Sequence, residues 1–334
     1  MKNPKVTVLM SVYNGEKYLR EAVDSILAQT FRDFEFLIIN DGSTDRTGEI
    51  LKSYSDQRIK IINHEKNIGL TKSLNKGLRV AKGEYVARQD ADDISMPERL
   101  DKEVAFLDTN KNVGLVGTDY FLINEKDKII DKINCLTESK DLKEKLLEGN
   151  QFAHGSIVFK KECIEKVGMY REEFKFAQDF DFVLRISEIF HIANIPEFLY
   201  KWRINIDSVS VNKKTLQDKY ALLAIELAKE RREKGRDKLQ YLPDEERKKF
   251  LDSYLFSSIH KNHYKEISNN YFFWSKILYQ GKDYTGALKL IFKGILSNPT
   301  NIELWSYALK IFTNLIFPKP IINLLRYIKR IIFF

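Results

Sequence analysis

Three aspartates stand within four residues, directly after a short apolar run of strand type at residues 84–87: Asp90, Asp92 and Asp93. Carboxylates crowded at the end of a strand repel one another unless a positive group lies among them. Asp90 and Asp92 are two residues apart, so on a strand that leaves the sheet both can turn toward one point. Hard oxygen ligands suit Mg²⁺ or Mn²⁺, which complete their shells with water and substrate phosphates. The spacing therefore predicts a site for one of these ions.

An acidic turn before a helix is the alternative interpretation of the same segment. Ser95-Met96-Pro97-Glu98 has the spacing of a capping box, with proline at the first helical position. A cap would explain residues 95–98, but it leaves the three acids before them without a role. The neighbouring segments favour the metal site.

Apolar strand-like runs alternate with stretches of helical periodicity in the first hundred residues. This alternation predicts a parallel sheet covered by helices on both faces. Ligands bind such sheets at the carboxyl ends of the strands. Three polar turns fall at these ends, at residues 13–15, 41–45 and 90–93.

The pattern changes in the second half of the chain. Short strands are predicted at 113–117 and 156–159, a helix from 178 and an extended stretch at 196–202. From about 213 onward the periodicity is helical, and Gly281 to Tyr284 separates two of the helices. We therefore expect a sheet domain at 1–212 and an all-helical region at 213–334.

Composition limits the classes of protein. The 334 residues are 43% hydrophobic and 31% charged, as in globular proteins. A net charge of +8 suits nucleic acid, an anionic membrane or phosphorylated substrates, but no basic–aromatic stripe supports nucleic acid. Two cysteines, no signal peptide before the first strand and no apolar run of about 18 residues indicate a cytoplasmic location.

Several segments, in order, resemble glycosyltransferase family 2, the inverting sugar transferases with the GT-A fold. The resemblance covers roughly residues 5–210. It rests on Val8–Gly15, Ile38–Asp45, Asn67–Leu70, Lys82–Tyr85, the acidic turn, His154–Phe159, Ala177–Asp181, Arg203–Asn205 and Ser208–Ser210.

The resemblance implies a nucleotide-sugar donor, with uridine diphosphate as the expected carrier. It assigns Asp92 as the direct ligand of Mn²⁺ or Mg²⁺, and Asp90 as a metal or ribose contact. Ala91, between them, is expected to contact the donor. An ion there would stabilise the charge that grows on the leaving diphosphate.

The nucleotide itself is expected to meet the first two turns. Asp41 is placed to accept a hydrogen bond from the uracil N–H, with Tyr13 near the base. Ser11 and Lys72 are further candidates. Asp41 is also a common turn residue, and Lys72 has the alternative of a solvated helix lysine.

Asp179 is the expected base, which takes the proton of the acceptor hydroxyl as that oxygen attacks. A position at the start of a helix favours the ionised form that a base requires. The alternatives are that Asp179 only caps the helix, or that Asp181 is the base, although two residues along a helix Asp181 faces elsewhere.

Four weaker candidates for the acceptor or diphosphate site follow from the resemblance: His154, Gln178, Arg203 and Asn205. Gln178 stands where the family commonly has Glu, and Asn205 where it often has His. Asn40 likewise replaces one of two paired acids, while Asp41 remains.

The last residues form a basic amphipathic segment. Residues 304–334 hold five Lys or Arg and no acid. One helical face is aliphatic and the other carries Arg326, Lys329 and Arg330; the aliphatic face is formed by Ile321, Ile322, Leu324, Leu325, Ile328, Ile331 and Ile332. Such a helix binds anionic membrane surfaces, and the alternative is docking on the protein's own helices.

The sequence thus predicts a metal-assisted inverting transferase that moves a sugar to a saccharide or lipid-linked saccharide, at the cytoplasmic face of a membrane. A nucleotidyltransferase is one alternative, but it would show a Gly-rich phosphate loop where this chain has Ser11 to Gly15. A non-catalytic assembly protein that keeps the fold is the other.

Overall fold

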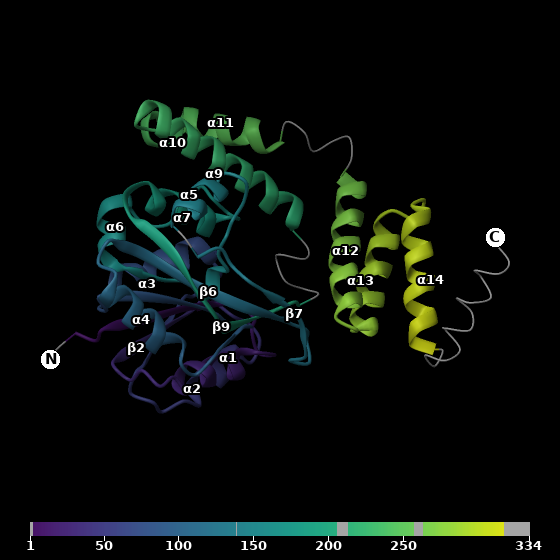
Figure 1. Cartoon of the computed structure of the whole chain (residues 1–334), viewed down its shortest axis with the longest axis horizontal. Coiled ribbons are helices and arrows are strands. Elements are labelled where there is room, and N and C mark those ends of the chain that lie inside the picture. Colours follow the sequence, from purple (N-terminus) through teal and green to yellow (C-terminus); the bar gives the residue numbers. More distant parts are fainter. Residues whose placement is uncertain (1–2, 138, 206–212, 257–262, 317–334) are drawn as a thin grey trace. The chain divides into compact units, whose positions relative to one another are not determined.

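The computed structural model describes residues 3–137, 139–205, 213–256 and 263–316 (Figure 1). The chain divides into two compact units. The first comprises residues up to 121 together with 132–203 and 217–255, and the second comprises 122–131, 204–216 and the residues from 256 onward. Residues 217–255, which the sequence analysis grouped with the helical C-terminal region, pack with the core of the first unit.

Nine strands of the described residues form one sheet in the order β3-β2-β1-β4-β8-β6-β9-β5, with β7 beside β6. β1 pairs in parallel with β2 and β4, and β2 with β3, whereas β8 is antiparallel to β4 and β6. The strands are β1 (Val6–Val12), β2 (Phe34–Asn40), β3 (Ile59–Asn63), β4 (Tyr85–Asp90), β5 (Ile94–Ser95), β6 (Val113–Ile123), β7 (Ile129–Ile133), β8 (Val158–Lys160) and β9 (His191–Arg203). The expected parallel sheet is confirmed in its N-terminal half.

The helices of the first unit form two layers, one on each face of the sheet (Figure 1). They are α1 (Leu19–Leu27), α2 (Thr47–Lys52), α3 (Leu70–Val80), α4 (Arg99–Thr109), α5 (Ser139–Lys145), α6 (Lys161–Val167), α7 (Gln178–Ile189), α9 (Lys214–Lys234), α10 (Lys238–Tyr241) and α11 (Asp244–Phe256), with a 3₁₀ turn, η1, at His154–Ser156.

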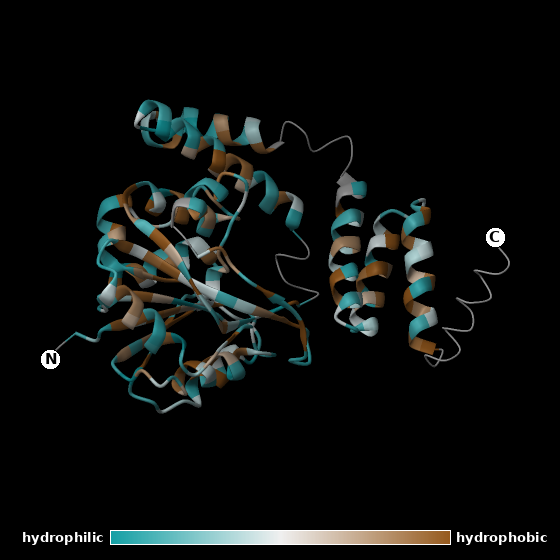
Figure 2. Cartoon of the chain, viewed as in Figure 1, coloured by the Kyte–Doolittle hydropathy of each residue, from teal (hydrophilic) through white to brown (hydrophobic). Residues whose placement is uncertain are grey.

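Alternate residues of β1 enter different cores because successive strand side chains point to opposite faces. Val8 and Met10 pack with α1 and α4, while Leu9 packs with α3, α7 and α9. Figure 2 shows the matching pattern, with hydrophobic residues concentrated on the strands. Every residue of β1 except Ser11 is buried.

The capping box expected at residues 95–98 does not form. α4 begins at Arg99, and its N-cap residue is Glu98, without a side-chain cap. Ser95 lies in β5 instead, where its hydroxyl donates to Gln89 Oε1 at 2.6 Å and accepts from Arg99 Nη1 at 2.9 Å. A buried arginine thus competes successfully for the oxygen that a cap would use.

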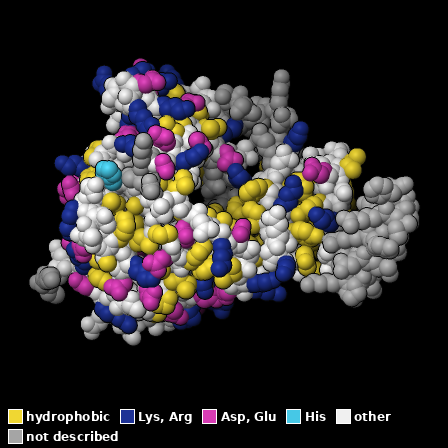
Figure 3. Space-filling view, viewed as in Figure 1, with side chains coloured by type: hydrophobic (Ala, Val, Ile, Leu, Met, Phe, Trp, Pro, Cys, Tyr) yellow, Lys and Arg dark blue, Asp and Glu magenta, His cyan; other side chains and the backbone are white. Residues whose placement is uncertain are grey.

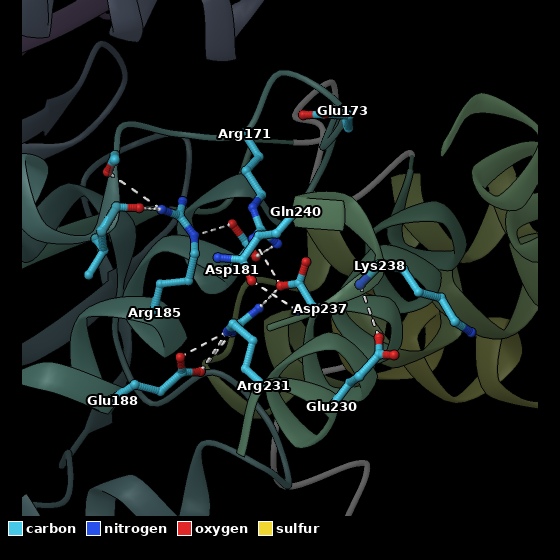
Figure 4. Close-up of polar contacts among 12 residues, drawn as sticks. Arg171, Glu173, Asp181, Arg185, Glu188, Glu230, Arg231, Asp237, Lys238 and Gln240 are labelled. Atoms are coloured by element: carbon cyan, nitrogen blue, oxygen red, sulfur yellow. Dashed lines mark hydrogen bonds and ion pairs between the residues drawn. The ribbon is translucent and has the colours of Figure 1, made fainter. Parts of the chain in front are cut away.

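A buried network of ion pairs joins α9 and α10 to α7 (Figure 4). Asp181 of α7 pairs with Arg185 at 2.9 Å and with Arg171 at 3.3 Å. Arg171 also pairs with Asp237 at 2.9 Å, and Arg231 of α9 bonds the same Asp237 carboxylate. Arg231 continues to Glu188 at the end of α7, at 2.8 Å. The helices after residue 213 therefore anchor the helix on which Asp179 lies; the six charges, three of each sign, balance.

The second unit contains α12 (His263–Gln280), α13 (Tyr284–Ser297) and α14 (Ile302–Ile316) with residues 122–131 of the β6–β7 hairpin. Asn124 Nδ2 donates to Asp283 Oδ2 at 2.6 Å in the turn between α12 and α13. The predicted aliphatic face at 321–332 lies outside the described residues. Among the described helices, none has the length and apolarity needed to cross a membrane.

Replacing Asp237 should destabilise the first unit. Asp237→Ala leaves buried arginines short of an acceptor, and breaking such pairs costs about 3–5 kcal/mol of the free energy of unfolding. The measurement is urea unfolding of the full chain followed by circular dichroism. The control is Arg79→Ala, whose pair with Glu172 is half-exposed at 3.9 Å and should contribute less than about 1 kcal/mol. Equal effects of the two changes would contradict the anchoring role of the network.

Candidate active site

The polar turns after β1, β2 and β4 meet at one edge of the sheet. The parallel register sets Ser11 beside Asp90. The first two turns are bonded together: the Asn14 amide donates to Ser43 Oγ at 3.0 Å, and Asn14 Oδ1 accepts from the Thr44 amide at 2.8 Å. The predicted convergence of these loops is therefore confirmed.

The turn after β1 also reaches the acidic turn. A Cβ placed on Gly15 would lie 4.0 Å from the Cβ of Ala91. Tyr13, the first residue after β1, is half exposed. Ser11, Tyr13 and Ala91 thus line one stretch of the sheet edge, as expected for residues that meet one ligand.

Asp41 organises the turn that precedes α3. Its Oδ1 accepts from the Ile68 amide at 3.0 Å and lies 2.8 Å from His64 Nδ1, and its Oδ2 accepts from the Gly69 amide at 2.9 Å. Burial works to raise the pKa of Asp41, but the hydrogen bonds from Ile68 and its neighbours outweigh it and lower the pKa. Asp41 is therefore ionised, and it is buried among donors from Ile68, Gly69, His64 and Ser73.

His64 also lies at this edge of the sheet, although the sequence pattern did not single it out. It follows β3 directly, and its amide donates to the Asn40 carbonyl at 2.9 Å, so it lies at the same sheet edge. Its Nδ1 contacts Asp41, whereas its buried Nε2 has no hydrogen-bond partner among the described residues. Its position in the sequence could have indicated this, because a polar residue at the carboxyl end of a parallel strand lies at the edge of the sheet where ligands bind.

Lys72 lies in the first turn of α3 and is exposed. It follows the Asp41-bound segment at 68–69 by three residues, so its backbone lies near the edge of the sheet where β1 and β2 end. The described contacts favour neither a donor-binding role nor a solvated one.

The acidic turn keeps its charges close together. Burial, followed by the negative charge of Asp90, raises the pKa of Asp92 to about 6. Asp90 is partly exposed at the end of β4, and its Oδ1 accepts from Arg88 Nη2 at 2.5 Å. The ionised form of Asp92 is therefore destabilised, and a bound cation would stabilise it.

Two carboxylates are enough for a bound Mg²⁺ or Mn²⁺ because these ions keep water and substrate phosphates in their shells. No preformed group of three His, Cys, Asp or Glu suited to a metal occurs in the part of the chain that the structure describes. Asp90 and Asp92 supply the hard oxygen ligands, and the raised pKa of Asp92 shows an unmet need for positive charge. The residues present therefore fit a divalent ion that is completed by the substrate.

Asp93 holds the acidic turn to β9 from behind. Its Oδ2 accepts from Tyr200 Oη at 2.9 Å and its Oδ1 from the Arg203 amide at 2.8 Å. Arg203 Nε donates to the Asp92 carbonyl at 2.7 Å, and its Nη2 donates to Glu21 at 2.7 Å. The buried Arg203, a candidate for the diphosphate, thus positions the turn that carries Asp92.

Arg88 is a second residue that the sequence reading did not single out. It is fully buried, and its Nε donates to His154 Nε2 at 3.2 Å. Burial, then the Arg88 charge, lowers the pKa of His154 well below its usual range, so this histidine is neutral. A Cβ on the adjacent Gly155 would lie 1.8 Å from Tyr200 Oη and 3.0 Å from Asp90 Oδ2, so η1 packs directly against the acidic turn.

Asp179 lies in the first turn of α7, after Ala177, which adopts a left-handed conformation at φ 52°. Asn150 Nδ2 donates to Asp179 Oδ2 at 3.1 Å. Burial raises the pKa of Asp179 to about 6, against the lowering effect of the Phe180 amide and with a further increase from Asp90. Burial therefore outweighs the expected effect of the helix start, and the carboxylate has the pKa of a base that works near neutral pH.

The remaining candidates separate into different environments. Gln178 is buried beside Asp179. Asp181 belongs to the ion-pair network, where burial is outweighed by Arg185 and Arg171 and its pKa is lowered. Asn205 falls in the second unit, two residues beyond the end of β9. Asp179 rather than Asp181 is thus the carboxylate of α7 that shares an electrostatic environment with the acidic turn.

The site can perform two kinds of chemistry at once. The Asp90–Asp92 pair suits a cation with phosphates, and Asp179 is a separate carboxylate that can accept a proton. Asn150, a loop residue with no distinguishing sequence pattern, restrains that base.

Comparison with known proteins agrees with this arrangement. The model of "Glycosyl transferase family 2" matches residues 7–168. An O-antigen biosynthesis glycosyltransferase, WbnJ of Escherichia coli, is 37% identical over 207 residues, which cover 60% of this chain and 80% of that protein.

Solved structures share the fold. S. aureus TarS 1-349 in complex with UDP-GlcNAc superposes with a TM-score of 0.55 at 16% identity, over 93% of this chain and 92% of that one. The mannosyltransferase PcManGT from Pyrobaculum calidifontis, in complex with GDP-Man and Mn²⁺, gives a TM-score of 0.52 at 17% identity, over 93% and 85%. The chain therefore belongs to glycosyl transferase family 2 and is a glycosyltransferase with the GT-A fold.

Proposed function

We propose that this glycosyltransferase moves a sugar from a nucleotide-diphosphate sugar, with UDP as the carrier, to a saccharide or lipid-linked saccharide with inversion at C1. The observation that carries the proposal is a pair of carboxylates with shifted pKa values in one electrostatic environment. Asp92 and Asp179 both have a pKa of about 6, and Asp90 raises both values. Asp92 suits stabilisation of the leaving group, and Asp179 suits deprotonation of the acceptor.

The donor nucleotide is proposed to bind along the edge formed by Ser11, Tyr13 and Ala91. Asp41, which is ionised, is the proposed acceptor for the uracil N–H. His64 holds Asp41 at 2.8 Å and thereby fixes its direction. TarS and PcManGT, which share the fold, were solved with UDP-GlcNAc and with GDP-Man, so the fold accommodates different bases and UDP remains part of the proposal.

Asp92 and Asp90 are proposed to hold Mn²⁺ or Mg²⁺. When bound, the ion would offset the negative charge that grows on the diphosphate as the C1–O bond breaks. Arg203, Tyr200 and Asp93 keep the turn in place through the contacts described above. The neutral His154 presents no charge of its own and orients the Arg88 guanidinium toward Asp90.

Asp179 is proposed to act as the base in a direct displacement. The acceptor oxygen forms the new bond to C1, the bond from C1 to the diphosphate oxygen breaks, and the hydroxyl proton passes to Asp179. The nucleoside diphosphate leaves with the electron pair. Gln178 and His154 are the proposed acceptor contacts.

We also propose that the acceptor lies at the cytoplasmic face of a membrane. WbnJ is named for O-antigen biosynthesis, a polysaccharide process. The net charge of +8 and the basic C-terminal sequence suit an anionic surface. Cys135 and Cys163 are both free, as expected in a reducing compartment.

Removal of the metal-binding carboxylate should abolish donor turnover. With a panel of nucleotide-sugars, we expect one donor to release its nucleoside diphosphate with Mn²⁺ and not with chelator, and Asp92→Asn to lower that rate about 10²–10³-fold. Asp101→Asn, an exposed aspartate of α4, is the matched control and should keep full activity. Turnover that is equal in chelator would contradict the metal site.

The base should affect transfer and not donor binding. Asp179→Asn should lower kcat for transfer to acceptor about 10²–10⁴-fold while the donor affinity, measured by calorimetry, stays within a factor of two or so of the unmodified chain. Unchanged transfer in this variant would remove Asp179 from the mechanism. Loss of donor affinity instead would assign it to the donor site.

The pH profile should report the same carboxylate. A pKa raised from 3.8 to about 6 means that the ionised base is lost as the pH falls through 6, so kcat should decline about tenfold per unit below it. Asn150→Ala removes a donor that favours the ionised form, so this acid limb should move upward by about half to one unit. Gln151→Ala, in the same loop, is the control. A limb that stays in place in Asn150→Ala would contradict the contact's role.

A further inference from the structure

An apolar face of α14 is open to solvent. Ile302, Trp305, Leu309, Phe312 and Ile316 follow one another at intervals of three and four residues, which places them on one side of the helix. All five are exposed by about half or more, and Ile302 reaches 81% and Leu309 67%. A different side of α14, with Leu304, Ala308 and Ile311, is buried. The helix therefore has two apolar sides, and only one is used for packing.

The open side continues at the turn into α14. Leu296, near the end of α13, is 80% exposed, and residues 298–301 connect it to Ile302. Trp305 lies over this turn and donates its Nε1 hydrogen to the Pro299 carbonyl at 2.9 Å. Its ring is held by one polar bond while half of its surface stays exposed. Leu296 and the five residues of α14 are called the apolar face below.

The basic charge of the chain is concentrated in the same region. Residues 263–334 hold ten Lys or Arg and three Asp or Glu, a net charge of +7, whereas residues 1–262 carry only +1. Within α14 the charged residues are Lys310 and Glu303, and neither belongs to the apolar face. The space-filling view shows hydrophobic and Lys or Arg side chains over the second unit, with few acids (Figure 3).

Charge decides which occupant fits the apolar face. The described residues 263–316 hold six Lys or Arg and three Asp or Glu, so a second copy of the chain would bring +3 against +3, which opposes association. Nucleic acid would place phosphates against a face that has no charged side chain. An anionic lipid surface satisfies both properties, because its headgroups attract basic residues while its acyl boundary accepts Trp, Leu and Phe side chains.

We propose that the apolar face of α14, with the basic residues of the described helices at 263–316, binds the surface of an anionic lipid bilayer. The helix lies along the surface, with Leu309 and Phe312 in the acyl boundary and Lys310 toward the headgroups. The purpose of this binding, delivery of the enzyme to a lipid-linked acceptor, rests on the function proposed above. The binding itself does not require turnover.

Vesicle sedimentation of the full chain tests the surface. The chain should bind vesicles of phosphatidylcholine with phosphatidylglycerol, and bind pure phosphatidylcholine at least tenfold more weakly. The double variant Leu309→Glu, Phe312→Glu should lose at least tenfold in binding to anionic vesicles. Leu222→Glu, at an equally exposed leucine of α9 in the first unit (57%), is the matched control and should bind as the unmodified chain does.

Tryptophan emission gives an independent readout. Anionic vesicles should shift the emission to the blue, and Trp305→Phe should remove most of that shift while sedimentation persists. Of the other two tryptophans, Trp274 is already buried and Trp202 is half-buried in β9 of the first unit. Unchanged sedimentation in the double variant would overturn the proposal. A variant that instead converts a dimer to a monomer in light scattering, without vesicle binding by either form, would assign the face to a second copy and overturn it equally.

Nucleoside diphosphate release in vesicle-free buffer separates this proposal from the transferase mechanism. The double variant should release nucleoside diphosphate at the unmodified rate, because α14 contributes none of the proposed site residues. Vesicle binding without turnover would support the surface and count against the proposed reaction. Turnover without vesicle binding would support the proposed reaction and count against the membrane surface.

Discussion

The site depends on keeping three carboxylates within four residues at the carboxyl end of one strand. Asp90, Asp92 and Asp93 lie in three different electrostatic environments. Arg88 pairs with Asp90, and β9 supplies hydrogen bonds to buried Asp93. Burial and the charge of Asp90 raise the pKa of Asp92 to about 6, although Arg203 acts to lower it. Burial, followed by the charges of Asp92 and Asp90, raises the pKa of Asp93 well above its usual range and favours its neutral form. Because Arg88 pairs with Asp90, Asp92 is the carboxylate of the turn that is left for a cation. That asymmetry, more than the number of acids, makes the turn suited to a cation and a diphosphate.

The rest of the first unit can be understood as support for this turn. β9 must be long enough to bring both Tyr200 and Arg203 under the acids, and η1 can approach only because Gly155 has no side chain. On the acceptor side, α7 is fixed through Asp181 to a network that extends to α9 and α10. A carboxylate within a first helical turn has little positional freedom once the next turn is locked by buried ion pairs, which suits the role of base proposed for Asp179.

The sequence was sufficient for whatever depends on local pattern. The apolar runs of β1, β2 and β4, the turns at one sheet edge and the aspartates in them follow from periodicity and from the geometry of parallel sheets. Arg88, His64 and Asn150 were not predicted because their roles arise from contacts with segments 23 to 66 residues away. At Ser95 a local pattern predicted a helix cap that does not form, because the buried Arg99 binds the serine hydroxyl. The helices at 217–255 look like those that follow them, and only their packing against α3 and α7 assigns them to the sheet unit.

The net charge of the whole chain hides an uneven distribution of charge along the sequence. A total of +8 suggests a basic protein, yet residues 1–262 carry +1 and contain a site that needs positive charge from its ligands. Surplus lysines near the acidic turn would compete with a divalent ion for Asp90 and Asp92 and would weaken the selection for a metal-bound diphosphate. A chain that must attract both a cation and an anionic surface can satisfy both only by separating the two charge distributions. Here the acidic turn lies in the first unit, and the basic excess lies in the sequence after residue 262.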